Sequence, residues 1–297
     1  MEVAERKPLD ATAYGVTLTL CAVWGVQQVV IKLTAPEVSL LMQGAIRSII
    51  ATVLVLVWAR LRGIPLLERD GTARTGLLAG SLFAVEFVFI YYGLGHTTAS
   101  RMSVFVYLAP IFAALFLHAT VPGERLAPAQ WLGVLLAFAG VAVAFSEGFT
   151  AARGSTLLGD ACGVVAALLW AATTTVIRAT NLARVAATKT FLYQIGCAAI
   201  VLPLASLALG EPGVVSLSGF AVASLAYQGI LAGFATLLAW FWLLRHYLAA
   251  RLGVLSFVTP LLGVLSGVVF LGDPLTGHFL LAALAVGAGI VLVNFRR

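Results

Sequence analysis

The stretch HTTASRMSVFVYLAP at residues 96–110 returns as HYLAARLGVLSFVTP at residues 246–260, 150 positions further along the chain. Five of the fifteen positions are identical, including Arg101 with Arg251 and Pro110 with Pro260. Self-similarity at a fixed offset indicates that one structural unit occurs twice in the chain. The composition shows what kind of unit it is.

The chain is strongly apolar. Hydrophobic residues form 61% of its 297 residues and charged residues only 10%, whereas a soluble domain carries about 25% charged residues. Mean hydropathy is +1.05. The sequence therefore predicts a polytopic membrane protein whose surroundings are the lipid bilayer. The 18 Lys and Arg residues against 12 Asp and Glu do not indicate nucleic-acid binding, because the basic residues lie mostly at the ends of apolar runs.

Charged residues, Gly and Pro divide the chain into ten candidate membrane spans, and each span needs about 20 mostly apolar residues. The spans are residues 13–33, 37–60, 74–95, 99–120, 129–147, 156–178, 186–208, 217–244, 248–271 and 275–295. The segments between them are short, so we expect no soluble domain. The three cysteines match no metal or redox spacing, and we expect no metal site and no cofactor.

The distribution of basic residues predicts the orientation. Fourteen Lys and Arg residues lie on the side of the two termini, three (Lys32, Arg101 and Arg153) lie on the other side, and Arg47 lies within a span. Because positive charge accumulates in cytoplasmic loops, both termini are predicted to be cytoplasmic. For a bacterial chain, this means a multi-pass protein of the inner membrane.

A second alignment shows how long the duplicated unit is. AVWGVQQVVIKLT at 22–34 matches LLWAATTTVIRAT at 168–180, which pairs Trp24 with Trp170. The first span thus corresponds to the sixth and the fourth to the ninth, so we expect an all-α protein with repeats at 1–150 and 151–297. Five spans is an odd number, so the two copies are predicted to be inverted in the membrane. This architecture is typical of secondary transporters, which bind substrate near the midplane between repeats.

The chain resembles the EamA-type drug/metabolite transporter superfamily, and within it the YddG-type aromatic amino acid exporters. The resemblance rests on Arg47, on GERLAPAQWLGVLLAFAGV at 123–141 and on GDACGVVAALLWAA at 159–172, and it extends over nearly the whole chain. It implies ten helices in two inverted copies, with helices one, three, four, six, eight and nine lining the transport path.

Two ionisable residues fall well inside predicted spans, Arg47 in the second and Glu86 in the third. A charge in the middle of a membrane helix costs at least about 2.5 kcal/mol, so each is a candidate functional residue. They could form a structural ion pair, or Glu86 could bind a proton or a substrate amine. The repeat counterpart of Glu86 is Thr236, so the two copies have diverged at this position.

Polar and aromatic residues at matching places in the two copies form the predicted substrate cavity. Gln27 and Gln28 follow Trp24 by three and four residues, as Thr173 and Thr174 follow Trp170, which places each set on one helix face. Hydrogen bonding between helices is an equally good explanation for any single one of these polar residues. The complete predicted cavity comprises Trp24, Gln27, Gln28, Glu86, Tyr91, Tyr107, Trp170, Thr173, Thr174, Trp240 and Phe257.

Pro110 and Pro260 interrupt the fourth and ninth spans at equivalent positions. Each proline lacks an N–H, which leaves a carbonyl one turn earlier without its helical partner. We expect the pair to act as hinges; a static bend is the alternative.

The residues favour a secondary transporter that exports small amphipathic metabolites. Among these, aromatic or large neutral amino acids are the expected substrates. The alternative is proton-coupled efflux of cationic drugs or quaternary ammonium compounds. A membrane-embedded enzyme would need a cluster of ionisable residues at one depth, and a channel a continuous polar stripe, and neither pattern is present. Beyond a small-molecule substrate and the bilayer we expect no partner, with a monomer or a weak homodimer.

Overall fold

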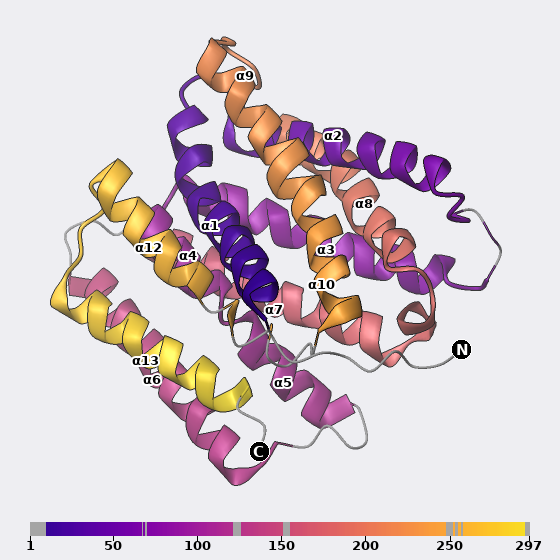
Figure 1. Cartoon of the computed structure of the whole chain (residues 1–297). Coiled ribbons are helices and arrows are strands. Elements are labelled where there is room, and N and C mark those ends of the chain that lie inside the picture. Colours follow the sequence, from indigo (N-terminus) through magenta and orange to yellow (C-terminus); the bar gives the residue numbers. More distant parts are fainter. Residues whose placement is uncertain are drawn as a thin grey trace.

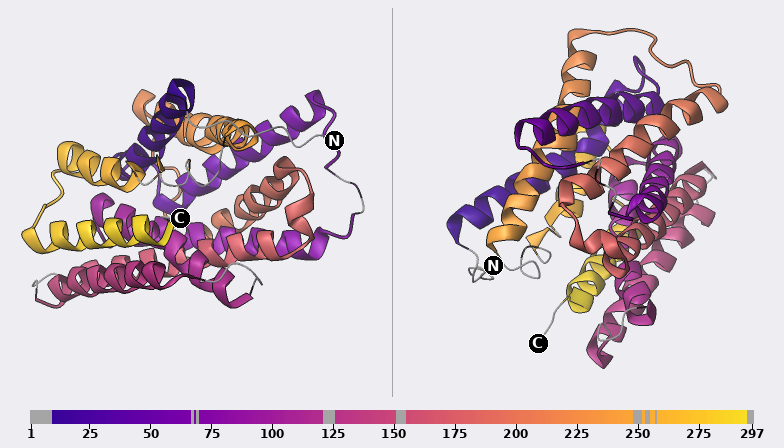
Figure 2. Two further views of the ribbon diagram at one scale, coloured as in Figure 1. Left: turned by 60° about the horizontal axis from the view of Figure 1, so that its bottom comes forward. Right: turned by 90° about the vertical axis from the view of Figure 1, so that its right-hand side faces the viewer.

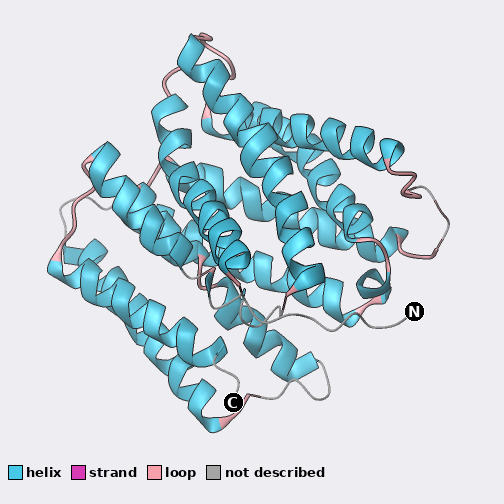
Figure 3. Cartoon of the chain, in the orientation of Figure 1, coloured by secondary structure: helices cyan, strands magenta, loops and turns pink. Residues whose placement is uncertain are grey.

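The computed structural model describes residues 10–66, 68, 70–120, 126–150, 155–247, 252, 255, 256 and 258–294. Within this part the chain is helical apart from its connecting segments and an isolated antiparallel β-bridge between Val38 and Val214 (Figure 3). The prediction of an all-α protein is confirmed for these residues.

Most of the described helices lie within a few residues of the predicted spans, but α12 begins at Val258, ten residues after the predicted start of the ninth span. The first half of the chain contains α1 (Ala11–Thr34), α2 (Leu40–Leu61), α3 (Ala73–Leu94), α4 (Ala99–Val106), α5 (Ala109–Thr120) and α6 (Pro128–Thr150). The second half contains α7 (Ser155–Ala179), the 3₁₀ turn η1 (Asn181–Arg184), α8 (Ala187–Ala208), α9 (Gly219–Ala226), the π-helical segment η2 (Tyr227–Ala235), α10 (Thr236–His246), α12 (Val258–Leu271) and α13 (Gly277–Asn294).

The described helices have the length and the surface of membrane spans. Seven of them, with α4–α5 and α9–η2–α10 each counted as one, are long and apolar enough to cross a bilayer, and three further apolar stretches are shorter, at Pro128–Ala144, Val258–Leu271 and Gly277–Val293. Large apolar side chains face outward, and Leu61 and Leu207 are 76% and 70% exposed. Such an exterior suits lipid, because a soluble protein does not expose apolar patches this extensive.

The fourth predicted span is broken rather than continuous. The N–H of Leu108 donates to the carbonyl of Phe105, which ends α4, and Pro110 lies in the first turn of α5. Pro260 likewise lies in the first turn of α12. A proline is tolerated there because the first N–H groups of a helix have no partner within that helix.

Glycine allows the helices to approach closely. In α6 and α13, which lie side by side in Figures 1 and 2, a Cβ added to Gly133 would be 2.7 Å from the carbonyl oxygen of Gly289. These two helices and several others meet around two buried apolar clusters, and Trp170 of α7 packs against both clusters. In Figure 1, α1 begins and α13 ends on the same side of the bundle.

Polar contacts hold α2, α3 and α8 together at their ends. Lys189, the third residue of α8, donates to the Asp70 carboxylate at 2.8 Å and to the carbonyl of Glu68 at 2.9 Å. The Lys189 ammonium keeps the pKa of Asp70 well below its ordinary range. Beside the start of α2, Glu211 accepts from the Ser39 hydroxyl and from the Leu41 N–H. These fixed ends frame the interior in which the candidate site lies.

Candidate functional site

A chain of buried hydrogen bonds crosses the interior from α3 to α1. The Tyr91 hydroxyl donates to the amide oxygen of Gln228 at 3.3 Å, and the Gln228 amide nitrogen donates to Gln43 at 2.9 Å and to Ser224 at 3.2 Å. Ser224 shares a further hydrogen bond with Thr34 at 2.5 Å. Tyr91, Gln43 and Gln228 are fully buried. The chain therefore joins α1, α2, α3 and the α9–η2 junction through polar groups that lipid and water do not reach.

Gln228 is the second residue of the π-helical segment η2. π-Helical turns within α-helices often lie at functional sites. Glycines on η2 bring it against α2: a Cβ added to Gly229 would lie 2.8 Å from Ile50, and one added to Gly233 would lie 3.7 Å from the Cγ of Arg47. Gln228 thus lies beside Gln43, and Gly233 of the same segment lies beside Arg47.

The two predicted intramembrane charges lie in the same region. Glu86 is 4% exposed, and its Oε2 has no hydrogen-bond partner within the described residues. The Nε of Arg47 also lacks a partner there, although the charge of Arg47 acts on Glu86. The Arg47 guanidinium lies 4.5 Å from the centre of the Phe87 ring. The structure places no direct ion pair between these two described residues; an aromatic ring occupies the position beside Arg47 instead.

Aromatic rings continue along α3 from this point. The Phe83 and Phe87 rings are 4.6 Å apart, and those of Phe87 and Tyr91 are 6.1 Å apart. The Tyr91 ring lies on Gly44 of α2, where a Cβ would come within 2.6 Å of it. A carboxylate, a guanidinium and a row of aromatic rings thus occupy adjoining faces of α2 and α3.

The other predicted aromatic residues form two pairs. The Trp24 and Trp240 rings are 5.9 Å apart, and the Trp24 indole N–H donates to the Thr236 hydroxyl at 3.2 Å, joining α1 to α10. Tyr107, at the end of α4, meets Trp170 of α7 with ring centres 5.8 Å apart. The structure brings these rings together within each pair, but the two pairs pack in different clusters.

The predicted polar residues have different environments. Gln27 is 9% exposed, and the Oε1 of Gln28 is buried without a hydrogen-bond partner in the described part of the chain. The Thr173 hydroxyl donates to the carbonyl of Leu169 in its own helix, while Thr174 is half-buried. Phe257 lies outside the described residues.

A cavity of about 460 Å³ lies between α1 and the η2–α10 segment. Thr19 and Leu20 line one wall, and Thr236 and Ala239 line the other. Its lining is mainly apolar, and it extends to Thr12 in the first turn of α1. Within the described part of the chain, none of the predicted cavity residues lines it; Thr236, which accepts the hydrogen bond from the Trp24 indole, does.

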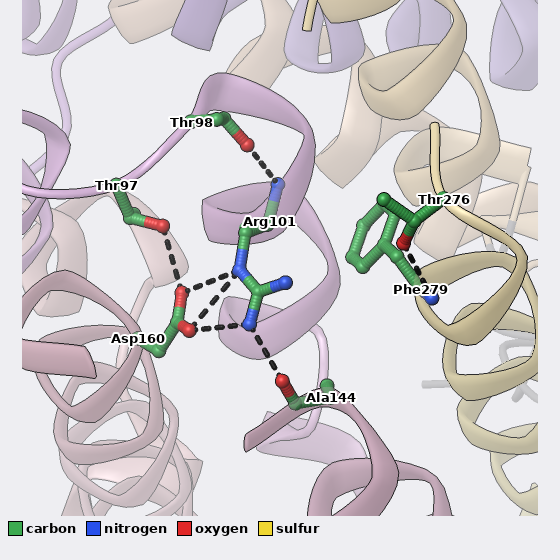
Figure 4. A network of polar contacts seen from close by, with 7 residues as sticks. All are labelled: Thr97, Thr98, Arg101, Ala144, Asp160, Thr276 and Phe279. Atoms are coloured by element: carbon green, nitrogen blue, oxygen red, sulfur yellow. Dashed lines mark hydrogen bonds and ion pairs between the residues drawn. The ribbon is translucent and has the colours of Figure 1, made fainter. Parts of the chain in front are cut away.

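The sequence analysis missed the buried ion pair between Arg101 and Asp160. Arg101, which it counted among the charges at helix ends, is 8% exposed, and its guanidinium contacts Asp160 at 2.6 Å (Figure 4). The signals were present, because Arg101 recurs as Arg251 and Asp160 follows the first glycine of GDACG. Gln43 and Gln228 were also missed, although each is a single amide within an apolar run.

Comparison with known proteins places the chain among transporters. A model of the EamA-like transporter family matches residues 11–146 and residues 157–295. The chain is 22% identical over 279 residues to "Uncharacterized transporter YoaV" of Bacillus subtilis, which covers 94% of this chain and 95% of that protein. It is 24% identical over 288 residues to the "Probable amino-acid metabolite efflux pump" of Escherichia coli, covering 94% and 93%.

Two further likenesses agree with this. "Uncharacterized inner membrane transporter YedA" of Escherichia coli is 24% identical over 288 residues, covering 95% of this chain and 90% of that protein. A solved crystal structure superposes with a TM-score of 0.65 at 23% identity and covers 95% of this chain and 98% of that one. At that identity the structure shows a shared fold.

Proposed function

Because the chain belongs to the EamA-like transporter family, we propose that it is a secondary transporter that exports small amphipathic metabolites. Its proposed substrates are aromatic or large neutral amino acids. It is a multi-pass protein of the bacterial inner membrane. The likeness to a protein named as an amino-acid metabolite efflux pump supports the choice of substrate class.

The transport mechanism in this proposal is alternating access between two inverted five-helix repeats, 1–150 and 151–297, with both termini cytoplasmic. Two separate family matches, one in each half, support the division. The position of the two ends of the helical array, with α1 beginning where α13 ends, agrees with an even number of spans (Figure 1).

One observation carries the substrate proposal: Glu86 and Arg47 each keep a buried polar atom without a partner in the described structure, and Arg47 lies over the Phe87 ring of the aromatic row on α3. A buried polar group without a hydrogen bond is unfavourable by about 1–3 kcal/mol, so such atoms are natural partners for a ligand. An amino acid carries an ammonium group for the carboxylate, a carboxylate group for the guanidinium, and a side chain for the rings.

The same observation supports a second candidate. A lone buried carboxylate beside aromatic rings also suits a lipophilic cation, because rings attract cations across their faces. In that case Glu86 serves as counter-charge or proton carrier, and the protein is a drug efflux transporter.

Uptake into proteoliposomes of the purified protein decides between them. Labelled phenylalanine, tryptophan, threonine and a quaternary ammonium compound are compared with and without an imposed pH gradient. We expect saturable amino-acid uptake that unlabelled amino acids inhibit and that Glu86→Gln abolishes. The matched control is Glu68→Gln, which changes an exposed carboxylate of the α2–α3 connection. Uptake of the cation alone, lost in Glu86→Gln, would replace the amino-acid assignment by drug efflux.

A further inference from the structure

A buried polar cluster connects the helices at the end of the bundle where α3 ends and α7 begins. It consists of Lys32, Thr97, Arg101 and Asp160, here called the Asp160 cluster. Asp160 has no exposed surface, and its carboxylate accepts the Nε–H of Arg101, which both oxygens share, one N–H of the Arg101 Nη2 and the Thr97 hydroxyl (Figure 4). The cluster thus holds a carboxylate fully surrounded by donors.

The cluster extends to two further helices. The Nη2 of Arg101 also donates to the carbonyl of Ala144 in α6 at 2.8 Å, and the Lys32 ammonium, near the end of α1, donates to the carbonyl of Thr97 at 2.6 Å. Next to Arg101, the Ser100 N–H and hydroxyl donate to Asp273, which follows α12. Five helices therefore meet in one set of charge-assisted contacts, which are the strongest kind of hydrogen bond.

Glycines allow α3 and α7 to pack closely next to the cluster. A Cβ added to Gly159 would lie 2.6 Å from Thr97, and one added to Gly93 would lie 2.7 Å from Cys162. The backbones of α3 and α7 are consequently in direct contact, and Cys162 is 4% exposed. No aqueous path passes between α3 and α7 at this end while the described contacts persist.

The opposite end has a weaker counterpart. Asp10 immediately precedes α1, whereas Asp160 is the sixth residue of α7. The hydroxyl of Tyr247, the repeat counterpart of Thr97, donates one hydrogen bond that the two Asp10 carboxylate oxygens share, each at 2.9 Å. Asp10 is exposed, and its pKa is lowered chiefly by the N–H of Ala13, which it caps. Beside this contact, α1 and η2–α10 are separated by the cavity of about 460 Å³. Equivalent interfaces are thus closed at one end and open at the other.

From this asymmetry we infer that the Asp160 cluster is the gate that closes the transport path at the end away from the chain termini. The gate opens when Asp160 leaves Arg101 and Thr97, and the cavity between α1 and α10 then closes. The inference rests on the proposed function insofar as it assumes alternating access. It assigns roles to four residues outside the candidate substrate site.

A native thiol reports on this gate. In the full-length protein with Cys21→Ala and Cys197→Ala, Cys162 is the remaining cysteine, and its reaction with a water-soluble maleimide is followed over time. We expect Asp160→Asn to accelerate labelling by about tenfold or more, since it weakens the charge-assisted hydrogen bonds that hold the cluster together. Thr97→Val, a milder change that removes one donor, should accelerate it less. Asp70→Asn, which breaks the ion pair with Lys189 elsewhere, is the matched control and should have no effect.

A second reporter separates a gate from simple loosening. Ala239→Cys, in a background without the three native cysteines, places a thiol in the cavity wall of α10. If the Asp160 cluster is a gate, Asp160→Asn lowers the labelling rate at position 239 while it raises the rate at Cys162. A cluster with a structural role alone would raise both rates or leave position 239 unchanged, and either result would overturn the inference.

Folding of each variant is checked by gel filtration and thermal melting. If Asp160→Asn does not fold, Thr97→Val decides alone, and unchanged rates at both positions would refute the gate. Neither labelling experiment contains a substrate, so a failure of the amino-acid proposal leaves these results intact. Conversely, substrate uptake is measured without either reporter, so it stands if the gate is refuted.

Discussion

Gln228→Met tests whether the buried polar chain between α1, α2 and α3 stabilises the bundle. Methionine keeps the length and approximate volume of glutamine but removes three hydrogen bonds, those with Tyr91, Gln43 and Ser224. Hydrogen bonds between membrane helices contribute about 0.6 kcal/mol each on average. The free energy of unfolding should therefore fall by about 2 kcal/mol.

The measurement is reversible unfolding of the purified protein in mixed micelles as the fraction of denaturing detergent rises. Thr52→Val is the matched control, because the Thr52 hydroxyl donates only to the carbonyl of Ser48 in its own helix. We expect the control to change stability by less than about 0.5 kcal/mol. The double variant with Gln43→Met should lose less than the sum of the two single variants, since both remove the same hydrogen bond.

Equal effects of Gln228→Met and Thr52→Val would refute this reasoning. So would strict additivity with Gln43→Met, because it would mean that the two amides contribute independently although they are 2.9 Å apart.

Two further outcomes follow from contacts at the interface of α3 and α8. Gly80→Ala should lower the free energy of unfolding by about 1–3 kcal/mol, as overpacking does, because the new Cβ would lie 2.6 Å from the Sγ of Cys197. Gly196→Ala on α8 is the control and should not lower the melting temperature, because the space around Gly196 is open. The depressed pKa of Asp70 means that its pairing with Lys189 stabilises the folded state above the unfolded carboxyl pKa of about 3.9 and is lost as pH falls below it. Asp70→Asn should therefore flatten the decline of melting temperature in acid, and an unchanged acid profile would contradict this role.

The general architecture could be predicted from local patterns. Runs of about 20 apolar residues are sufficient to identify membrane helices, because the bilayer requires both the length and the hydrophobicity. The repeated segment at 96–110 and 246–260 showed in addition that the two halves are related. The helix breaks near Pro110 and Pro260 were predictable for the same reason, since a missing N–H is a local property.

The candidate site was only partly predictable. Trp24 with Trp240 and Tyr107 with Trp170 were expected to line one cavity, and each pair does meet across two helices. Glu86 and Arg47 were conspicuous as charges in apolar runs, but the position of Phe87 beside Arg47 depends on how α2 rotates against α3. Rotation of one helix about its axis leaves no trace in an apolar sequence, because almost every face is hydrophobic.

The sequence by itself determined the membrane environment and the helical class, and it predicted the duplication, because each depends on composition or spacing along the chain. Only the tertiary structure decided that Arg101 is buried and pairs with Asp160. It also decided that Gln228, in the π-helical segment, donates a hydrogen bond to Gln43. These contacts join residues separated by 59 and 185 positions. Their free energy depends on distances of a few ångströms between helices, which packing around glycine sets and which the order of residues does not show.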